Sequence, residues 1–333
     1  MSARFFYPLL GIAIVVLFLL NLLTGSVRIP VADVLGILAG GDAQRETWHY
    51  IVWETRFPQT CTALLCGSAL AVCGLLLQTA FRNPLAGPGI FGITNGAGLG
   101  VALVMLLLGG SISSALMEVS GFLAVILAAF IGAMAVTALL FLFSMMVKNN
   151  VMLLIVGMMT GYLSSSAISL LNYVATEEGV RSYMLWGMGN FAGVSLHLLP
   201  LFAVLVALGV LGSLLLMKSL NAWLLGDHYA ENLGINTRRL RNVLLFVTGM
   251  LCAVTTAYCG PVTFIGLAVP HIARLLIGTE NHRHLIPATL LTGAAVALLC
   301  NWISILPEGS TIPLNAVTPL VGAPVIIYVI MKR

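Results

Sequence analysis

Charged residues are scarce in this chain: only 15 lysines and arginines and 11 aspartates and glutamates occur among its 333 residues. No polar stretch is long enough to form a soluble catalytic domain, 60% of the residues are hydrophobic, and the mean hydropathy is +1.06. The strand-like alternation of apolar and polar residues is also missing, which argues against a transmembrane barrel. Because a backbone in lipid must satisfy its own hydrogen bonds, the composition predicts a membrane protein built from helices.

The residues that several kinds of chemistry need are also missing. The sequence has no Gly-x-x-x-x-Gly-Lys-Ser/Thr loop for nucleotide phosphates, so any energy from ATP has to come from a partner. The six cysteines form no Cys-x-x-Cys pair and are interpreted as buried thiols. His282 and His284, the only close pair of histidines, flank Arg283, which disfavours a metal site. We therefore predict no cofactor, no metal and no enzymatic activity, and we attribute the net charge of +4 to membrane topology rather than nucleic-acid binding.

The apolar runs are long enough to cross a bilayer, which takes about 20 residues of helix. Their breaks predict ten spans, near residues 5–25, 58–80, 92–110, 119–146, 151–172, 192–216, 241–258, 262–276, 285–304 and 313–331. The first run is too long for the apolar part of a signal peptide and is predicted to be a retained helix. We expect one transmembrane domain over residues 1–333. Two sets of five spans would enter the membrane from opposite sides, which favours a transporter with an inverted repeat, although no residue-by-residue repeat is visible.

The basic residues gather on one side of the predicted membrane. If the N-terminus is cytoplasmic, the inside holds Arg4, Arg82, Lys148, Lys218, Arg238, Arg239, Arg241, Arg274, Arg283, Lys332 and Arg333, and the outside holds Arg28, Arg45, Arg56 and Arg181. This distribution follows the positive-inside rule and predicts that both termini are cytoplasmic.

Two glycine- and proline-containing segments interrupt the apolar runs. Gly92, Gly96 and Gly100 follow a cytoplasmic turn and form a smooth helix face, for which close helix packing is the favoured interpretation. Further along the chain, Pro270 interrupts a short apolar run, as in a broken or tilted helix. The adjacent His271 is interpreted as a structural hydrogen-bonding residue rather than a proton relay.

The longest cytoplasmic connection, residues 217–240, contains a candidate interaction helix. Leu225, Tyr229, Ala230 and Leu233 are spaced for one face of a short helix outside the membrane, and Gly234 is placed to end it. An apolar face outside the membrane needs a partner; the alternatives are a solvated loop or a helix on the membrane surface.

These segments together resemble the FecCD-type permeases, the membrane subunits of ATP-driven importers for iron-siderophores, haem and cobalamin. The resemblance rests on Arg56-Phe57-Pro58, Arg82-Asn83-Pro84-Leu85-Ala86, Leu185-Trp186-x-Met-Gly189, Gly226-Asp227-x-x-Ala230-x-x-Leu233-Gly234, Phe264-Ile265-Gly266-Leu267-x-x-Pro270-His271-x-x-Arg274 and Pro313 to Gly322-Ala-Pro324. It covers nearly the whole chain and implies an all-α, polytopic permease of the type II importer architecture, with about ten transmembrane helices in each subunit.

The resemblance also implies partners and sites. We expect a homodimer, two ATPase subunits on the cytoplasmic face, a periplasmic or lipid-anchored substrate-binding protein on the other face, and a place in the bacterial inner membrane. The expected ATPase-coupling residues are Leu225, Gly226, Asp227, Tyr229, Ala230, Glu231, Leu233 and Gly234. The expected lining of the translocation path, from the fifth and tenth spans, is Gly157, Thr160, Gly161, Ser164, Asn315, Thr318 and Gly322. Ordinary helix packing is the alternative for the residues of the fifth span.

The chain departs from the family at the outer surface, where Gln59 replaces the second arginine of an Arg-x-Pro-Arg motif. Arg56 and Gln59 remain the candidates for docking the binding protein. Ferric siderophore is the first expectation for the substrate, followed by haem and cobalamin. The rival hypotheses are an ion-coupled secondary transporter, which would need carboxylates within its spans, and a membrane-embedded enzyme, which would need clustered ionisable groups.

Overall fold

The long apolar runs form helices, which satisfy the backbone hydrogen bonds within each segment. The structure is a computed structural model, and it describes residues 3–41, 44–107, 112–114, 117–119, 121–147, 150–307 and 311–331. The elements of the first half are α1 (Ala3–Leu23), α2 (Val31–Leu38), α3 (Glu46–Tyr50), the π-helix η1 (Ile51–Arg56), α4 (Phe57–Phe81), α5 (Ile93–Ala102), the π-helix η2 (Leu103–Leu107), β1 (Ile112–Ser114), β2 (Met117–Val119), α6 (Gly121–Met146) and α7 (Asn150–Val174). Those of the second half are α8 (Glu177–Gly187), α9 (Leu199–Leu215), α10 (Met217–Leu224), α11 (Asp227–Asn232), α12 (Thr237–Cys259), α13 (Ile265–Ile277), α14 (His282–Ile305) and α15 (Leu314–Met331).

The ten predicted spans all correspond to helices. Within the described residues, six helices are long and apolar enough to cross a membrane, and α9 with α10 forms a seventh candidate that is bent by 48°. Three shorter apolar helices, Ile93–Leu107, Ile265–Ile277 and Leu314–Tyr328, account for the rest. The prediction of an all-α polytopic fold is confirmed. Most cysteines are also buried free thiols, as expected; Cys61 is only partly buried.

Several predicted boundaries are wrong, each for a local reason. The second span does not begin near residue 58, because α3, η1 and α4 form one continuous apolar helix from Glu46 to Phe81. The sixth span begins at Leu199 rather than near 192, because the Ser195 carbonyl accepts hydrogen bonds from the backbone of Leu198 and Leu199 in a turn that precedes Pro200. α12 begins at Thr237, where the Asn236 side chain caps the helix.

Three elements between the spans were not predicted. They are α2, α8 and the hairpin in which β1 and β2 pair antiparallel. α8 begins at a Thr176 side chain that accepts a hydrogen bond from the Gly179 backbone at 3.2 Å. Hydropathy misses α2 and α8 because each is too short to span a bilayer.

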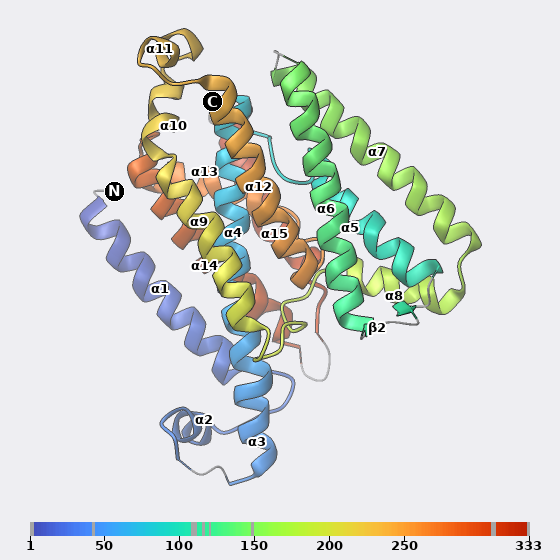
Figure 1. Cartoon of the computed structure of the whole chain (residues 1–333). Coiled ribbons are helices and arrows are strands. Elements are labelled where there is room, and N and C mark those ends of the chain that lie inside the picture. The colour runs from blue at the N-terminus through green and yellow to red at the C-terminus, as the bar shows by residue number, and fades with distance from the viewer. Residues whose placement is uncertain are drawn as a thin grey trace.

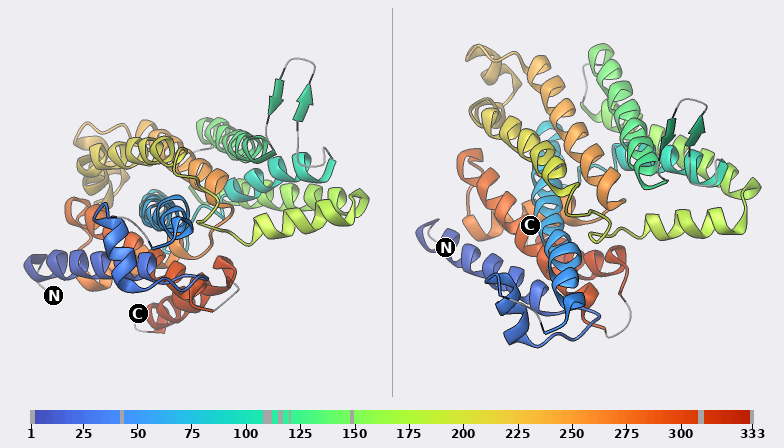
Figure 2. Two further views of the ribbon diagram at one scale, coloured as in Figure 1. Left: turned by 90° about the horizontal axis from the view of Figure 1, so that it is seen from below. Right: turned by 60° about the horizontal axis from the view of Figure 1, so that its bottom comes forward.

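Helix α4 runs through the middle of the bundle, with α9, α12, α13 and α14 packed around it (Figures 1 and 2). Glycines let the backbones approach closely there. A Cβ on Gly74 would overlap the carbonyl oxygen of Gly266 on α13, and one on Gly266 would lie 2.9 Å from the carbonyl oxygen of Leu70. Small residues at crossing points of this kind are typical of membrane helices.

Helices α5, α6 and α7 lie together on the side of the bundle away from α1 (Figure 1). Gly96 and Gly100 of α5 touch the backbone of α6 at Ala128 and Gly132, which confirms the packing interpretation of the glycine face. Gly92 has φ +72°, a conformation that glycine adopts without strain, and begins α5.

Candidate functional site

A short helix, α11, projects beyond the main bundle at the end toward which both termini lie (Figure 1). We call this the α11 end, and the opposite end, which carries α2 and α3, the α2 end. Glycines with positive φ flank the helix, Gly226 at +116° and Gly234 at +82°. The backbone N–H of Gly234 donates to the Glu231 carbonyl, which confirms the predicted stop.

Three apolar side chains on α11 and its flanks are exposed, beside the polar Asp227, His228 and Glu231. Leu225, Tyr229 and Leu233 are 65%, 51% and 58% exposed, and no part of the described chain covers them. Ala230, which was predicted to share this face, is fully buried instead. Because successive helical positions rotate by about 100°, Ala230 turns inward when its neighbour Tyr229 turns outward. We call Leu225, Tyr229 and Leu233 the apolar face of α11.

Polar contacts fix α11 to the body of the protein. The Oδ1 atom of Asp227 accepts hydrogen bonds from Arg82 Nη2 at 2.7 Å and from Trp223 Nε1 at 2.5 Å. At the other end of the helix, Glu231 accepts a hydrogen bond from the hydroxyl of Thr237 at 2.9 Å. Arg82 ends α4 with φ +46°, so these contacts join α11 to α4, α10 and α12.

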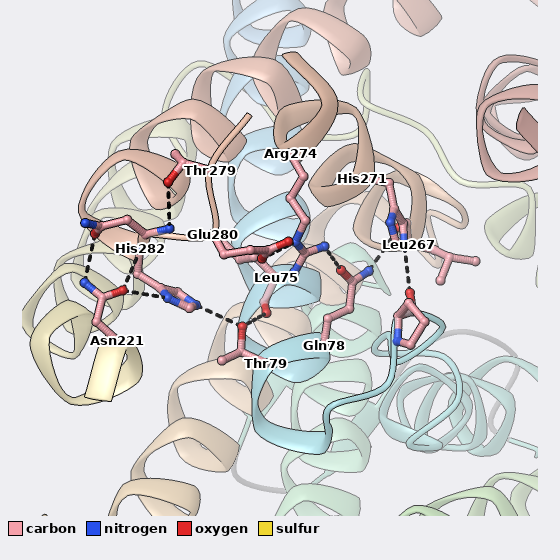
Figure 3. Close-up of polar contacts among 12 residues, drawn as sticks. Leu75, Gln78, Thr79, Asn221, Leu267, His271, Arg274, Thr279, Glu280 and His282 are labelled. Atoms are coloured by element: carbon pink, nitrogen blue, oxygen red, sulfur yellow. Dashed lines mark hydrogen bonds and ion pairs between the residues drawn. The ribbon is translucent and has the colours of Figure 1, made fainter. Parts of the chain in front are cut away.

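A second network at the same end joins α4 to α10, α13 and α14 (Figure 3). His282 Nε2 lies 2.9 Å from Thr79 Oγ1, and the backbone N–H of His282 donates to Asn221 Oδ1 at 2.7 Å. Arg274 donates to Gln78 Oε1 at 2.6 Å and pairs with Glu280 at 3.0 Å. The His282 ring is therefore used in helix-to-helix contacts.

His271 is buried on α13, and its Nε2 donates to the Pro84 carbonyl at 2.8 Å. This contact agrees with the structural role predicted for His271, because the ring nitrogen is used in a hydrogen bond to a backbone carbonyl. It also holds the segment between α4 and α5 against α13.

The predicted path residues of α7 face the interior of the subunit. Gly157 and Gly161 lie against Phe91 and Gly92, where added Cβ atoms would come within 3.0 Å and 3.3 Å of the backbone. Ser164 is buried, and its hydroxyl donates to the carbonyl of Thr160 at 3.0 Å. The Thr160 hydroxyl donates in the same way to the preceding turn. Within one subunit these small side chains serve helix packing, the alternative considered from the sequence.

The predicted path residues of α15 also face inward. Asn315 Nδ2 donates to the carbonyls of Gly187 and Pro261 at 3.0 Å and 2.6 Å, while Oδ1 accepts the Thr263 backbone N–H at 3.0 Å. Asn315 thus joins the end of α8 to the connection before α13. Thr318 is buried, and a Cβ on Gly322 would touch Phe264 and Ala268 of α13 at 3.2 Å and 3.3 Å.

A hollow of about 330 Å³ opens between the segment after α4 and the connection that leads into α13. Its polar lining includes Thr94, Asn95, Thr256 and Thr263, and no charged residue lines it. Asn95 Nδ2 donates to the Gly161 carbonyl at 3.1 Å and to Ser165 Oγ at 3.0 Å. The hollow is neutral and lies beside α7.

The predicted docking arginine does not reach the surface. Arg56 is 5% exposed, and its guanidinium donates to the carbonyls of Leu22 at 2.8 Å, Leu23 at 3.3 Å and Val27 at 2.5 Å. Leu22 and Leu23 lie in the last turn of α1 and Val27 lies just beyond it, where a cation satisfies otherwise unpaired acceptors. The prediction that Arg56 meets a binding protein is therefore corrected: it ties α1 to η1.

Gln59 is also engaged inside the subunit. Its Nε2 donates to Asn301 Oδ1 at 3.0 Å, and Asn301 in turn donates to Asn21 Oδ1 at 2.7 Å. Asn21 completes the chain by donating to the carbonyls of Leu17 and Leu298. Gln59 is half-buried and links α4 to α14, so a direct docking role for it is not supported.

Replacing Arg56 with methionine is expected to destabilise the protein by roughly 3 kcal/mol, because buried carbonyls lose a charged donor. Thermal unfolding in detergent measures the change. Arg45→Met, which removes an exposed arginine at the same end whose side chain contacts only the Trp48 ring, at 5.3 Å from its centroid, among the described contacts, is the matched control and should lower the midpoint much less. An Arg56→Met protein with normal stability and weakened attachment of a binding protein would restore the docking role.

Three residues of the α11 end were not singled out from the sequence. Arg82 entered only as a positive charge and a motif residue, and Trp223 and Asn221 did not enter at all. The spacing of Trp223 and Asp227, four positions apart, could have predicted their contact if both lay on one helix. Gly226, with its positive φ, interrupts the helix between them and weakens that signal. Contacts between distant segments, such as that of Arg82 with Asp227, leave no local pattern.

The fold and this site define a polytopic membrane permease, with an interaction helix at one end and no aspartate or glutamate among the buried residues of the described chain. A solved metal-chelate type ABC transporter in an inward-facing conformation has the same fold, with a TM-score of 0.86, 30% identity and 99% of both chains covered. PsaBC from Streptococcus pneumoniae, at 14% identity and a TM-score of 0.53 over 82% of this chain and 90% of its own, shares the fold alone.

Two relatives of similar sequence are the vitamin B12 import system permease proteins BtuC of Photorhabdus laumondii and Escherichia coli. Each is 34% identical to this chain; the matches cover 86% of this chain and 83% of the Photorhabdus protein, and 93% and 94% for the Escherichia coli protein. The profile of the FecCD transport family matches residues 13–332. The chain belongs to the FecCD transport family and is a multi-pass inner-membrane transport protein rather than an enzyme.

Proposed function

We propose that this chain is the membrane-spanning subunit of an ATP-driven importer that carries an intact metal chelate into the cell. The observation that carries the proposal is the apolar face of α11, which projects beyond the bundle and has no cover within the described subunit. An exposed apolar face of this kind marks an interaction site. Since the chain has no nucleotide-binding loop of its own, an ATPase subunit is the partner that fits.

The α11 end is then the cytoplasmic end, as the basic residues predict. Arg82 contacts Asp227 of α11, Arg238 and Arg239 lie in the first turn of α12, and Arg283 lies in the first turn of α14, in agreement with the positive-inside rule. The eight residues predicted from the sequence, from Leu225 to Gly234, remain the proposed coupling segment, with Ala230 and Asp227 anchoring it and the apolar face making contact. A substrate-binding protein docks at the α2 end.

The proposed assembly is a homodimer with two ATPase subunits. Helix α7 supports it, because one side of the helix packs on α5 while the other side leaves Met159, Tyr162 and Leu163 more than half exposed. A second copy placed against α7 would enclose a path between the two subunits. In this arrangement the exposed side of α7 lines the path, and Gly157, Gly161 and Ser164 support it from behind.

The described interior favours this mechanism over ion coupling. No aspartate or glutamate is among the buried residues of the described chain. A secondary transporter that uses protons or sodium needs such carboxylates within the membrane. A neutral lining instead suits a large chelate, because it offers contact without a strong charge to retain it.

Ferric siderophore remains the first prediction for the chelate, and cobalamin is the second candidate because the two relatives above are vitamin B12 permeases. The test is uptake into liposomes that contain this permease, its ATPase and its binding protein, with labelled ferric siderophore, cobalamin and haem compared. Accumulation of one chelate that depends on ATP supports the proposal. Binding of the ATPase without transport of any metal chelate would overturn it.

A further inference from the structure

Helix α11 is short and lies between two glycines at which the backbone can rotate. Gly226 and Gly234 have backbone conformations that residues other than glycine rarely adopt, and an added Cβ at either would meet no atom within 4 Å. The helix packs mainly on α10 and α12. A force applied to its exposed apolar face can therefore tilt α11, unless its polar contacts pass that force to the body.

The Asp227 carboxylate is placed to transmit a force on α11 to the rest of the subunit. One carboxylate oxygen accepts hydrogen bonds from both Arg82 and Trp223, so this side chain joins α11 to the end of α4 and to α10 at one point. Trp223 is almost fully buried, and Asn221 ties the same helix to the start of α14. The α10 side of the link is thus held by further contacts, and Arg82 is the other end of the link.

Arg82 begins a stiff segment that reaches α7. The Asn83 backbone N–H donates to the Gln78 carbonyl, and the Asn83 side chain accepts from the Leu85 backbone at 2.9 Å. At the far end of the segment, Phe91 is fully buried and its ring lies 4.3 Å from that of Phe81. Gly92, the next residue, lies directly against the backbone of α7 at Gly157 and Gly161. The 82–92 segment, which is packed against α4 at Phe91 and against α7 at Gly92, therefore connects Arg82 to α7.

We propose that Arg82, bound to Asp227 and through it to Trp223, is the positioning residue that transmits movement of α11 to the 82–92 segment and to α7. This inference rests on the proposed function, since it assigns the connection between ATP hydrolysis and the path. Packed elements of this kind switch between discrete arrangements, so a single polar link can bias which arrangement is occupied.

The link can be removed without unfolding the protein. The side chains of Arg82 and Asp227 are 51% and 49% exposed, and ion pairs at that exposure contribute little to stability. Arg82→Asn is the informative variant, because asparagine tolerates the positive φ at this position and leaves the Asp227–Trp223 contact in place. If Asp227 served only to begin α11, Arg82→Asn would leave the transport of chelate per ATP hydrolysed unchanged.

The measurement is the number of chelate molecules transported per ATP hydrolysed in liposomes that contain the complete importer. Arg82→Asn is expected to lower this ratio about tenfold, within the usual range of coupling between sites, while the ATPase still co-purifies in equal amount. Arg82→Lys, which keeps the charge, should recover most of the ratio. Glu280→Gln is the matched control, because it breaks the Arg274–Glu280 ion pair at the same end without touching α11.

The outcomes separate this inference from the proposed function. A wild-type complex that binds no ATPase or moves no chelate would overturn both. A wild-type complex that transports, with Arg82→Asn at the same ratio or with Glu280→Gln lowered equally, would overturn the transmission role alone.

Discussion

Replacing Gly74 with alanine is expected to destabilise the folded protein strongly and to lower its yield. The new methyl group would overlap the carbonyl oxygen of Gly266, and the two helices that carry these residues, α4 and α13, meet at the centre of the bundle. Neither backbone can give way, because α4 is surrounded by other helices (Figure 2). We expect a destabilisation of about 3 kcal/mol or more, the upper range for overpacked cores.

The measurement is the yield of monodisperse protein in detergent, followed by thermal unfolding of whatever is recovered. Gly11→Ala is the matched control, because Gly11 lies inside α1 and an added Cβ there meets nothing within 4 Å. It should express normally. A Gly74→Ala protein with wild-type yield and stability would show that α4 and α13 do not cross as closely as described.

Converting the apolar face of α11 to serine, at Leu225, Tyr229 and Leu233 together, is expected to abolish transport while leaving the fold intact. All three side chains are exposed within the subunit, so their loss removes few internal contacts. Among the side chains of an interface, a few central ones contribute about 2 kcal/mol or more each, and the rest contribute less. A loss of about 3 kcal/mol in total would weaken ATPase binding roughly a hundredfold.

The affinity for the ATPase subunit and the ATP-dependent uptake rate are both measured. Leu35→Ser, which replaces an exposed leucine of α2 at the opposite end, is the control and should bind the ATPase normally. If the triple variant binds the ATPase as tightly as the wild type does, α11 is not the contact, and the surface must serve another purpose.

The sequence predicted the helices well because the signal, a run of about 20 apolar residues, is local and physical. It also predicted α11 and its glycine stop, since both follow from short-range spacing. It failed where polar residues continue an apolar helix, as in η1, whose Glu54 and Arg56 concealed the start of the span. Whether a span bends, as α9 and α10 do, depends on packing rather than composition.

Residue roles were harder to predict, because a residue type does not tell which partner it meets. Arg56 looked like a surface charge, yet it satisfies carbonyls at the end of α1. Arg241 does the same for Ser144 and Val147 at the end of α6. The small residues of α7 looked equally suited to a path or to packing, and only the position of the 82–92 segment shows that they are packed within the subunit.

The central claim, ATP-driven import of a metal chelate, is tested most directly by one uptake measurement. Permease, ATPase and binding protein are reconstituted in liposomes with the chelate on the α2 side and ATP on the α11 side, and ionophores collapse all ion gradients. The account predicts that the chelate accumulates only when ATP is present and hydrolysed. Accumulation that requires an imposed proton or sodium gradient and proceeds without ATP would contradict it.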